Sequence, residues 1–254
     1  MYNFFRLMLC VITVALTSSC VSATDKTLSP PSDTKWINVE IKNPSQYTKP
    51  FPLEVVYISH KCTRERINGF DGSVIIEPSY NGIKIPLTQS GDDLWRAKIA
   101  LSGGGSCDWT LSEFNLGIAY TNATHLGKDL VPGTAVGATI AFDDDATKNG
   151  QFTRVQGDLS IRPTYYPYIR EWHLVRQENE LTLLAKENFL SYRVINADNI
   201  LYAPVLDESK LVKSIEPLKK VDGVHSKIIY PDGSVISDGT IFPDYDKVES
   251  MVVK

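Results

Sequence analysis

Apolar residues recur at every second position along most of the chain from Lys35 onward, and this alternation constrains the fold more than any other feature. Residues 36–41 and 53–58 are β-branched and aromatic runs with polar residues interleaved. Such a period of two predicts β-strands with one buried face. The same pattern, between segments of turn composition, predicts six further strands at residues 73–77, 82–87, 94–101, 114–120, 134–142 and 152–161. Four residues of one strand are expected to share a face: Trp95, Ala97, Ile99 and Leu101.

Short strands at these intervals predict a mainly β fold, built as an antiparallel β-sandwich or a barrel-like domain. The chain of 254 residues, 43% of them hydrophobic and 22% charged, suffices for one large domain or two small ones. We place the β-sandwich domain at residues 35–162. Residues 163–172 hold four aromatic residues and two prolines, which is typical of a linker or of a packed corner between lobes. A smaller C-terminal lobe, β-rich or α+β, is therefore expected over residues 163–254.

The expected C-terminal lobe has a less regular pattern. Residues 207–218 place leucine and isoleucine on one helical face and predict a short helix. Residues 178–188 are compatible with a strand or a short helix. Residues 227–236 predict a hairpin around their Pro-Asp-Gly sequence, and residues 239–243 predict one more short strand.

Residues 1–19 have the layout of a signal peptide. One cation, Arg6, precedes an apolar run at residues 7–16, which is too short to span a bilayer as a helix because spanning takes about 20 residues. The sequence that follows, Thr17-Ser18-Ser19-Cys20, resembles the lipobox of bacterial lipoproteins, although Thr17 stands where leucine is usual. The resemblance implies that Cys20 becomes a lipid-modified first residue. The alternative is an ordinary signal peptidase cut before Thr24.

Residues 20–34 are expected to form a polar tether between the lipid and the folded body. They are rich in threonine, serine, lysine, aspartate and proline, so they bury little apolar surface. In the lipoproteins that this chain resembles, aspartate after the lipidated cysteine commonly directs retention in the inner membrane. Val21 stands at that position here, which implies a periplasmic protein anchored in the outer rather than the inner membrane.

Two of the four cysteines remain for the folded body, because Cys10 lies in the apolar run and Cys20 is the expected lipid site. We expect Cys62 and Cys107 to form a disulfide bond, since a periplasm is an oxidising compartment. By the loop entropy that it removes from the unfolded chain, this bond would stabilise the fold by about 4 kcal/mol. The alternatives are two free thiols or a zinc site, and neither cysteine has a second cysteine at the short spacing that zinc sites use.

No motif in the chain predicts a catalytic chemistry. The sequence contains no Gly-x-Ser-x-Gly nucleophile turn, no His-Glu-x-x-His pair and no phosphate-binding glycine loop. Asp143, Asp144 and Asp145 offer oxygen ligands to calcium, but they lack the spacing of an EF-hand loop and are expected to form an acidic turn. The net charge of -4 gives no basic surface for nucleic acid. We therefore expect no catalytic residue, no metal and no cofactor.

Two clusters of cationic and aromatic residues favour protein binding instead, because arginine and tryptophan are enriched at the centres of interfaces. Arg64 and Arg66 follow Cys62, and the expected disulfide would fix them on a rigid loop beside Trp109. The second cluster consists of Tyr165, Tyr166, Tyr168, Arg170 and Trp172. The alternative is that the aromatic residues form the core of one lobe and that the charged residues are simply solvated.

The layout of the chain resembles that of the immunity lipoproteins that protect bacteria against type VI secretion phospholipase effectors. The features that carry the resemblance are the signal ending in Cys20, the polar tether and a β-rich body with one cysteine pair. The resemblance implies a stoichiometric inhibitor that docks on a protein toxin, a lipase, and blocks its active-site entrance. It identifies no contact residue. A structural or assembly lipoprotein of the envelope and an exported hydrolase are the alternatives.

Overall fold

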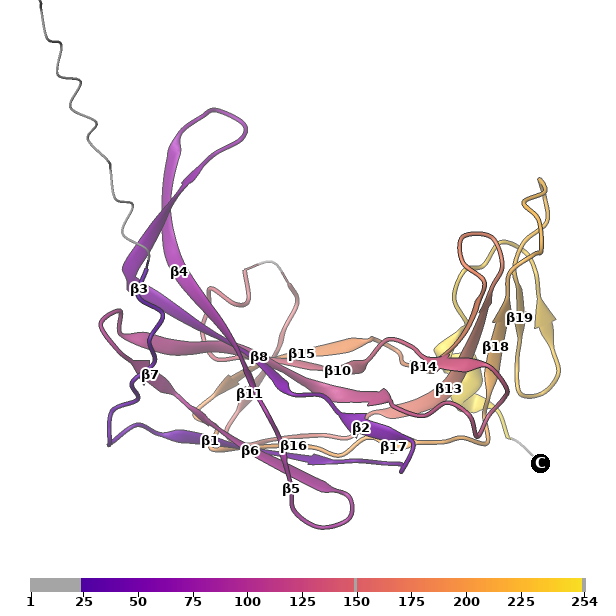
Figure 1. Ribbon diagram of the computed structural model, residues 1–254, viewed down its shortest axis with the longest axis horizontal. Coiled ribbons are helices and arrows are strands. Elements are labelled where there is room, and N and C mark those ends of the chain that lie inside the picture. Colours follow the sequence, from indigo (N-terminus) through magenta and orange to yellow (C-terminus); the bar gives the residue numbers. More distant parts are fainter. Residues whose placement is uncertain (1–23, 149, 253–254) are drawn as a thin grey trace, which may run out of the picture.

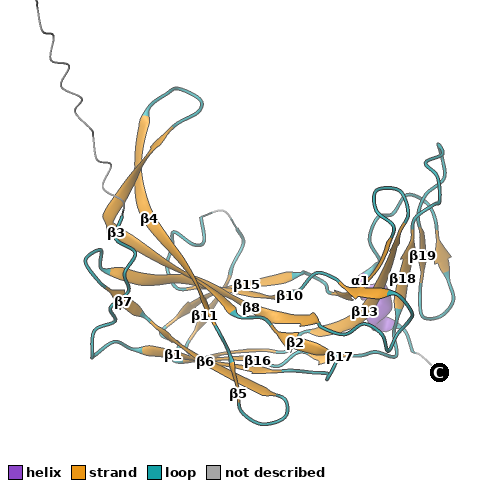
Figure 2. Ribbon diagram, viewed as in Figure 1, coloured by secondary structure: helices purple, strands orange, loops and turns teal. Residues whose placement is uncertain are grey.

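The computed structural model describes residues 24–148 and 150–252 and shows a mainly β protein (Figure 1). The regular structure of these residues consists of twenty strands in three sheets and one short helix, α1 (Tyr245–Ser250) (Figure 2). The predicted mainly β class is therefore confirmed. The expected signal peptide at residues 1–19 and the expected lipidation site Cys20 lie outside the described residues. Within the described part, no helix has the length and the hydropathy that crossing a bilayer requires.

The first and second sheets lie one above the other and enclose the main hydrophobic core, which makes the fold sandwich-like (Figure 1). The first sheet contains, in spatial order, β12 (Leu159–Ile161), β16 (Asn199–Tyr202), β1 (Trp36–Lys42), β6 (Leu94–Ala100) and β5 (Thr88–Gln89). The second sheet contains β11 (Thr153–Gln156), β15 (Phe189–Ile195), β10 (Val136–Ala141), β8 (Trp109–Tyr120), β3 (Leu53–Ile67) and β4 (Val74–Ile85). Two short strands, β2 (Thr48–Pro50) and β7 (Ser102–Gly104), also pair with β8.

The alternating pattern of the sequence produces this core. Ile37, Val39 and Ile41 of β1 are buried, whereas the residues between them are at least partly exposed. Phe114 and Leu116 of β8 are fully buried in the same core from the other sheet. The expected shared face of β6 also contacts this core, with Ile99 at its centre and the other three residues packed against it. Because the side chains of a strand alternate between its faces, one apolar face per strand is enough to build the sandwich.

Several strand pairs are parallel, so the prediction of an antiparallel sandwich is correct only for part of each sheet. β1 pairs antiparallel with β6 but parallel with β16, and β10 pairs antiparallel with β8 but parallel with β15. A parallel pair needs a long connection. Between β10 and β15, and between β1 and β16, the chain forms several other strands before it returns to form the parallel pair. The sheets are therefore mixed.

These long connections also make the domain organisation differ from the predicted one. β15 and β16 belong to the second half of the chain, yet they complete the second and the first sheet. The expected boundary between residues 35–162 and 163–254 therefore does not separate two cores. The sandwich includes residues 189–202, and the third sheet with α1 lies at one end of it (Figure 1).

The third sheet and α1 form what we call the C-terminal lobe, at one end of the long axis (Figure 1). Tyr166, Tyr168 and Val212 belong to a second, small core together with α1. Tyr165 and Ile169, which lie on the same strand as the two tyrosines, belong to the main core. The strands of this sheet are β20 (Val235–Ile236), β19 (Lys227–Ile229), β18 (Val212–Ile215), β13 (Thr164–Trp172), β14 (Glu178–Leu184) and β9 (Leu130–Pro132), with β17 (Val205–Leu206) beside β13. Both faces of β13 are thus covered.

The predicted helix at residues 207–218 is wrong, because β18 occupies part of this segment. Ser214 pairs with β13 on one side and with β19 on the other, and these tertiary pairings outweigh a short helical pattern. The hairpin around the Pro-Asp-Gly sequence is confirmed by the antiparallel pair of β19 and β20, and Gly233 supplies the positive φ of its turn. Residues 178–188 begin as the strand β14, whereas residues 239–243 form a loop rather than a strand.

The described part of the expected tether, residues 24–34, does not hang free but packs along the sandwich. Trp109 Nε1 donates a hydrogen bond to the Asp25 carbonyl oxygen (3.1 Å), and Ser29 N donates to the Gly103 carbonyl oxygen (2.8 Å). Side chains at Gly104 and Gly105 would collide with the backbone of Ser29 and Thr27. The triple glycine thus admits the N-terminal segment at close approach, and this contact replaces the expected tether from residue 24 onward.

Candidate binding surfaces

The predicted disulfide bond joins Cys62 of β3 to Cys107, with the two Cα atoms 5.3 Å apart. It lies where β3 leaves the second sheet, because the pairing of β3 with β8 ends at Ile58 and Thr110. Ser59 reinforces this point, since its hydroxyl donates to the Cys107 carbonyl oxygen (2.5 Å) and accepts from Cys62 N (2.9 Å). The disulfide therefore holds the foot of a projecting structure.

Beyond the disulfide, β3 and β4 continue as a two-stranded hairpin that stands away from the sandwich (Figures 1 and 2). We call residues 60–78 the arm. The paired residues of an antiparallel ladder share a face, so Ile67–Val74 and Glu65–Ile76 lie on one face of the arm. Ile67, Val74 and Ile76 are 72%, 60% and 69% exposed, and Phe70 in the turn is 99% exposed. A mostly apolar face, which also carries the exposed Glu65, thus lies open to solvent.

The opposite face of the arm is charged. Arg64 lies opposite Glu77 in the ladder, and its guanidinium is 2.7 Å from the carboxylate of that residue. Arg66 contacts the same carboxylate at 3.3 Å. The two arginines are therefore exposed beside the disulfide, as expected from the sequence, but they share one counter-ion within the arm.

Trp109, expected beside these arginines on a binding surface, is instead fully buried in the main core. It is the first residue of β8, a central strand, and its indole is covered by the N-terminal segment through the hydrogen bond to Asp25. The assignment of Trp109 to a partner-binding surface is therefore corrected.

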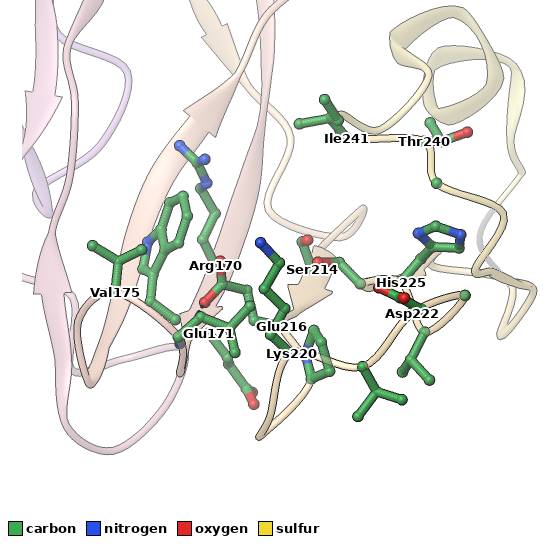
Figure 3. Close-up of a pocket in the computed structure, with 18 residues that line it drawn as sticks. Arg170, Glu171, Val175, Ser214, Glu216, Lys220, Asp222, His225, Thr240 and Ile241 are labelled. Carbon is green, nitrogen blue, oxygen red and sulfur yellow. Dashed lines mark hydrogen bonds between the residues drawn. The ribbon is translucent and has the colours of Figure 1, made fainter.

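The C-terminal lobe carries the second candidate surface, an open cavity of about 720 Å³ that we call the C-terminal cavity (Figure 3). Arg170 and Val175 lie on one side of it, His225 and Ile241 on the other, and Lys220 reaches between them. The walls come from the end of β13, the β13–β14 turn, residues 214–226 and residues 239–241. Loops from three separate parts of the chain thus converge on one site.

Arg170 and Trp172, both predicted as binding residues, meet in this cavity. The Arg170 guanidinium carbon lies 4.1 Å from the centroid of the Trp172 ring, and that of Arg176 lies 4.7 Å from it. The buried Glu180 accepts hydrogen bonds from Trp172 Nε1 (3.0 Å) and from Arg176 (2.6 Å). The indole is therefore fixed in position by contacts within the protein.

The β13–β14 turn beside this indole is held in the same way. Glu216 accepts hydrogen bonds from the backbone N–H groups of His173 (2.8 Å) and Leu174 (2.9 Å). The turn consequently presents Val175, which is 91% exposed, as a fixed apolar tip. Other exposed apolar side chains on the neighbouring loops are Leu174, Leu218, Val221, Val224, Ile241 and Phe242.

The three tyrosines of the second predicted cluster are buried, which corrects their assignment to a binding surface. Tyr166 and Tyr168 belong to the small core of the lobe, and Tyr165 to the main core. The Tyr165 hydroxyl lies 2.6 Å from that of Tyr202 in β16, so the pair links the third sheet to the first. The alternating pattern of β13 therefore means core on both faces, and only the end of the strand reaches the cavity.

The buried Tyr165–Tyr202 pair predicts a loss of stability in alkali. Burial raises the pKa of Tyr165 to about 12 and also raises the pKa of Tyr202. The unfolded chain ionises its tyrosines near pH 10, so the stabilisation is complete below pH 10 and is lost as the pH rises above it. We expect urea unfolding to give a free energy that falls above pH 10, by about 1.4 kcal/mol per pH unit for each protected tyrosine. A variant with Tyr165→Phe and Tyr202→Phe should have a shallower slope, and parallel curves would contradict this.

The acidic run at residues 143–145 forms a turn, the arrangement favoured over calcium binding. Asp143 accepts a hydrogen bond from Ala146 N (2.8 Å), Asp144 lies 3.5 Å from Arg193, and Asp145 contacts Lys148 and His60. Among the described residues, no group of three or more histidine, cysteine, aspartate or glutamate side chains is placed to hold a metal ion.

Comparison of the chain with protein-family models, with curated proteins and with solved structures gave no match. Functional inference therefore rests on the arm and the C-terminal cavity. The sequence predicted Arg64, Arg66, Arg170 and Trp172 on these surfaces, but it did not predict the apolar face of the arm or the apolar loop tips around the cavity. The run Val74-Ile75-Ile76, within the strand predicted over residues 73–77, was the available signal for the arm.

Proposed function

We propose that this protein is an exported lipoprotein that binds and inhibits a secreted antibacterial lipase toxin in the periplasm, and that the toxin docks on the C-terminal cavity. The observation that carries the proposal is the fixed stack of Arg170 on Trp172 in an open cavity with apolar loop tips. Tryptophan and arginine dominate binding energy when they are held in place, because little conformational freedom is then lost on binding.

The apolar rim supports a protein partner rather than a small polar ligand. Val175, Leu218 and Ile241 are 91%, 79% and 70% exposed, and a group of apolar side chains of this size on one end of a protein is typical of an interaction site. An enzyme that admits lipid chains has an apolar entrance, so such loops are complementary to it. The choice of a lipase follows the resemblance in chain layout.

The disulfide bond supports the proposed compartment. Cys62 and Cys107 are joined, and such bonds persist in oxidising spaces such as the periplasm. Lipidation of Cys20, with an anchor in the outer membrane, is part of the same proposal and follows from the lipobox resemblance.

The proposal predicts that cavity variants lose the partner. We expect Trp172→Ala and Val175→Asp each to weaken binding of the lipase toxin at least about thirtyfold, the change that corresponds to a hot-spot loss of 2 kcal/mol. Val175 is almost fully exposed, so Val175→Asp leaves the fold intact. The affinity is measured by calorimetry with the toxin encoded beside this gene, and protection by survival of cells that receive the toxin in the periplasm.

Val205→Asp is the matched control, because Val205 is also exposed but lies outside the cavity lining. It should retain full binding and protection. Capture of resident envelope proteins alone, with no effect of the cavity variants, would instead support an assembly lipoprotein. Lipid hydrolysis by this protein itself, abolished by one polar substitution without loss of fold, would support an exported hydrolase.

A further inference from the structure

We propose that the arm inserts its apolar end into the surface of the membrane to which the protein is anchored. This inference rests on the lipid anchor at Cys20 proposed above. The occupant of the apolar face of the arm is thus a lipid bilayer, whereas the C-terminal cavity takes the protein partner.

The N-terminal segment of the described chain lies at the foot of the arm. Asp25 is fixed at the foot of the arm, because its carbonyl oxygen accepts from Trp109 Nε1 (3.1 Å) and its carboxylate from the Ser106 hydroxyl (2.6 Å). Ser106 adjoins Cys107 of the disulfide that holds the arm. Figure 1 shows the first described residues, in indigo, beside this foot. The place where the chain leaves the body is therefore also the place where the arm begins.

The stretch of chain between Cys20 and Thr24 is short. Four peptide units join Cys20 to Thr24, and a fully extended chain of that length spans at most about 14 Å. Because residues 24–34 pack on the body, they add nothing to this reach. A lipid on Cys20 consequently keeps the foot of the arm within about 14 Å of the membrane surface.

Charged side chains lie near the foot of the arm, and apolar side chains lie near its tip. At about 3.3 Å per strand residue, Arg64 lies roughly 7 Å beyond Cys62, and Ile67 roughly 17 Å beyond it. The charged pair of Arg64 and Glu77 is thus near the foot, and Ile67, Val74 and Phe70 are near the tip. Because the foot lies at most about 14 Å from the surface, an arm directed at the membrane brings Ile67 at least roughly 3 Å below that surface. Phe70, in the turn beyond Ile67, lies deeper, toward the depth of about 5–10 Å at which interfacial apolar side chains typically sit.

Two polar side chains of the tip accept hydrogen bonds within the turn. Asn68 accepts a hydrogen bond from Phe70 N (3.0 Å), and Asp71 accepts from the N–H and hydroxyl of Ser73 (3.0 and 2.7 Å). Lys61, Arg64 and Arg66 balance Glu65, Asp71 and Glu77, so the arm carries no net charge. Attraction by anionic lipid is therefore secondary, and insertion depends on the apolar side chains.

The deciding experiment places a fluorescent reporter at the tip of the acylated protein. The protein is reconstituted in vesicles of phosphatidylethanolamine and phosphatidylglycerol with brominated acyl chains, which quench tryptophan on contact. The emission added by Phe70→Trp should be quenched at least about tenfold more than that added by Val235→Trp, an exposed position in the C-terminal lobe, with the parent protein as background. Equal quenching at the two positions would overturn the proposal.

A second measurement removes the anchor. The exported chain with Cys20→Ala should still float with the same vesicles, and Phe70→Asp or Ile76→Asp should reduce the floated fraction at least about tenfold, whereas Val235→Asp should not. Unchanged flotation of the arm variants would contradict insertion. Neither measurement involves the toxin, so failure of the proposed inhibitor function leaves both results readable.

Discussion

Replacing both Cys62 and Cys107 by serine is expected to lower the free energy of unfolding by about 4 kcal/mol. The bond spans a sequence separation of 45 residues, and the unfolded chain regains the entropy of that loop when the bond is absent. The expected loss is a large fraction of the stability of an ordinary domain, which is about 5–15 kcal/mol. Urea unfolding followed by tryptophan fluorescence measures it.

The parent protein unfolded in the presence of a reductant is the control, and it should match the double serine variant. Hydrogen exchange should also rise in the arm, because residues 60–78 lose the bond at their foot and an isolated two-stranded hairpin is barely stable. A loss below about 1 kcal/mol would show that the unfolded chain is already constrained near these cysteines.

Trp109→Ala is expected to destabilise the fold by about 3–5 kcal/mol, the range for removal of a large aromatic side chain from a core. Trp109 is fully buried, and its loss also removes the hydrogen bond that holds Asp25. Unfolding by urea gives the free energy. Limited proteolysis should then cut within residues 24–34, because these residues have lost their hydrogen bond to the Trp109 indole.

Trp36→Ala is the matched control, because Trp36 lies in β1 but is 46% exposed. We expect it to cost less than about 1.5 kcal/mol, since much of its side chain is already in water. Equal losses for the two tryptophans would contradict the assignment of Trp109 to the core.

Many strands of the sandwich could be predicted from the sequence because each one carries its own evidence, whereas β18 was predicted as a helix. In β1 and β6 the alternation of Val39 or Ala97 with polar neighbours indicates a half-buried strand without reference to the rest of the chain. The disulfide followed from simple counting of cysteines. The parallel pairing of β16 with β1 could not be predicted, because it joins residues about 160 positions apart and no local pattern encodes it.

The binding residues could be predicted only in part, since aromatic side chains serve cores and interfaces equally well. Tyr165 and Tyr168 lie in the same sequence run as Trp172, but Tyr165 is buried in the main core and Tyr168 in the small core that includes α1. The partner strands that bury them come from distant segments. Arg64 was easier to place, because a charged residue that follows a disulfide near a turn is seldom buried.

The arm and the loops around the C-terminal cavity project from the same side of the sandwich, at opposite ends of its long axis (Figure 1). If the arm enters a bilayer, that bilayer also faces the cavity. A partner bound to the membrane then reaches the cavity by lateral diffusion. Proteins that stay in solution, away from the membrane, reach the cavity less readily. Such an arrangement would select partners by their location at the membrane surface as well as by their shape. An enzyme bound to its lipid substrate has that location.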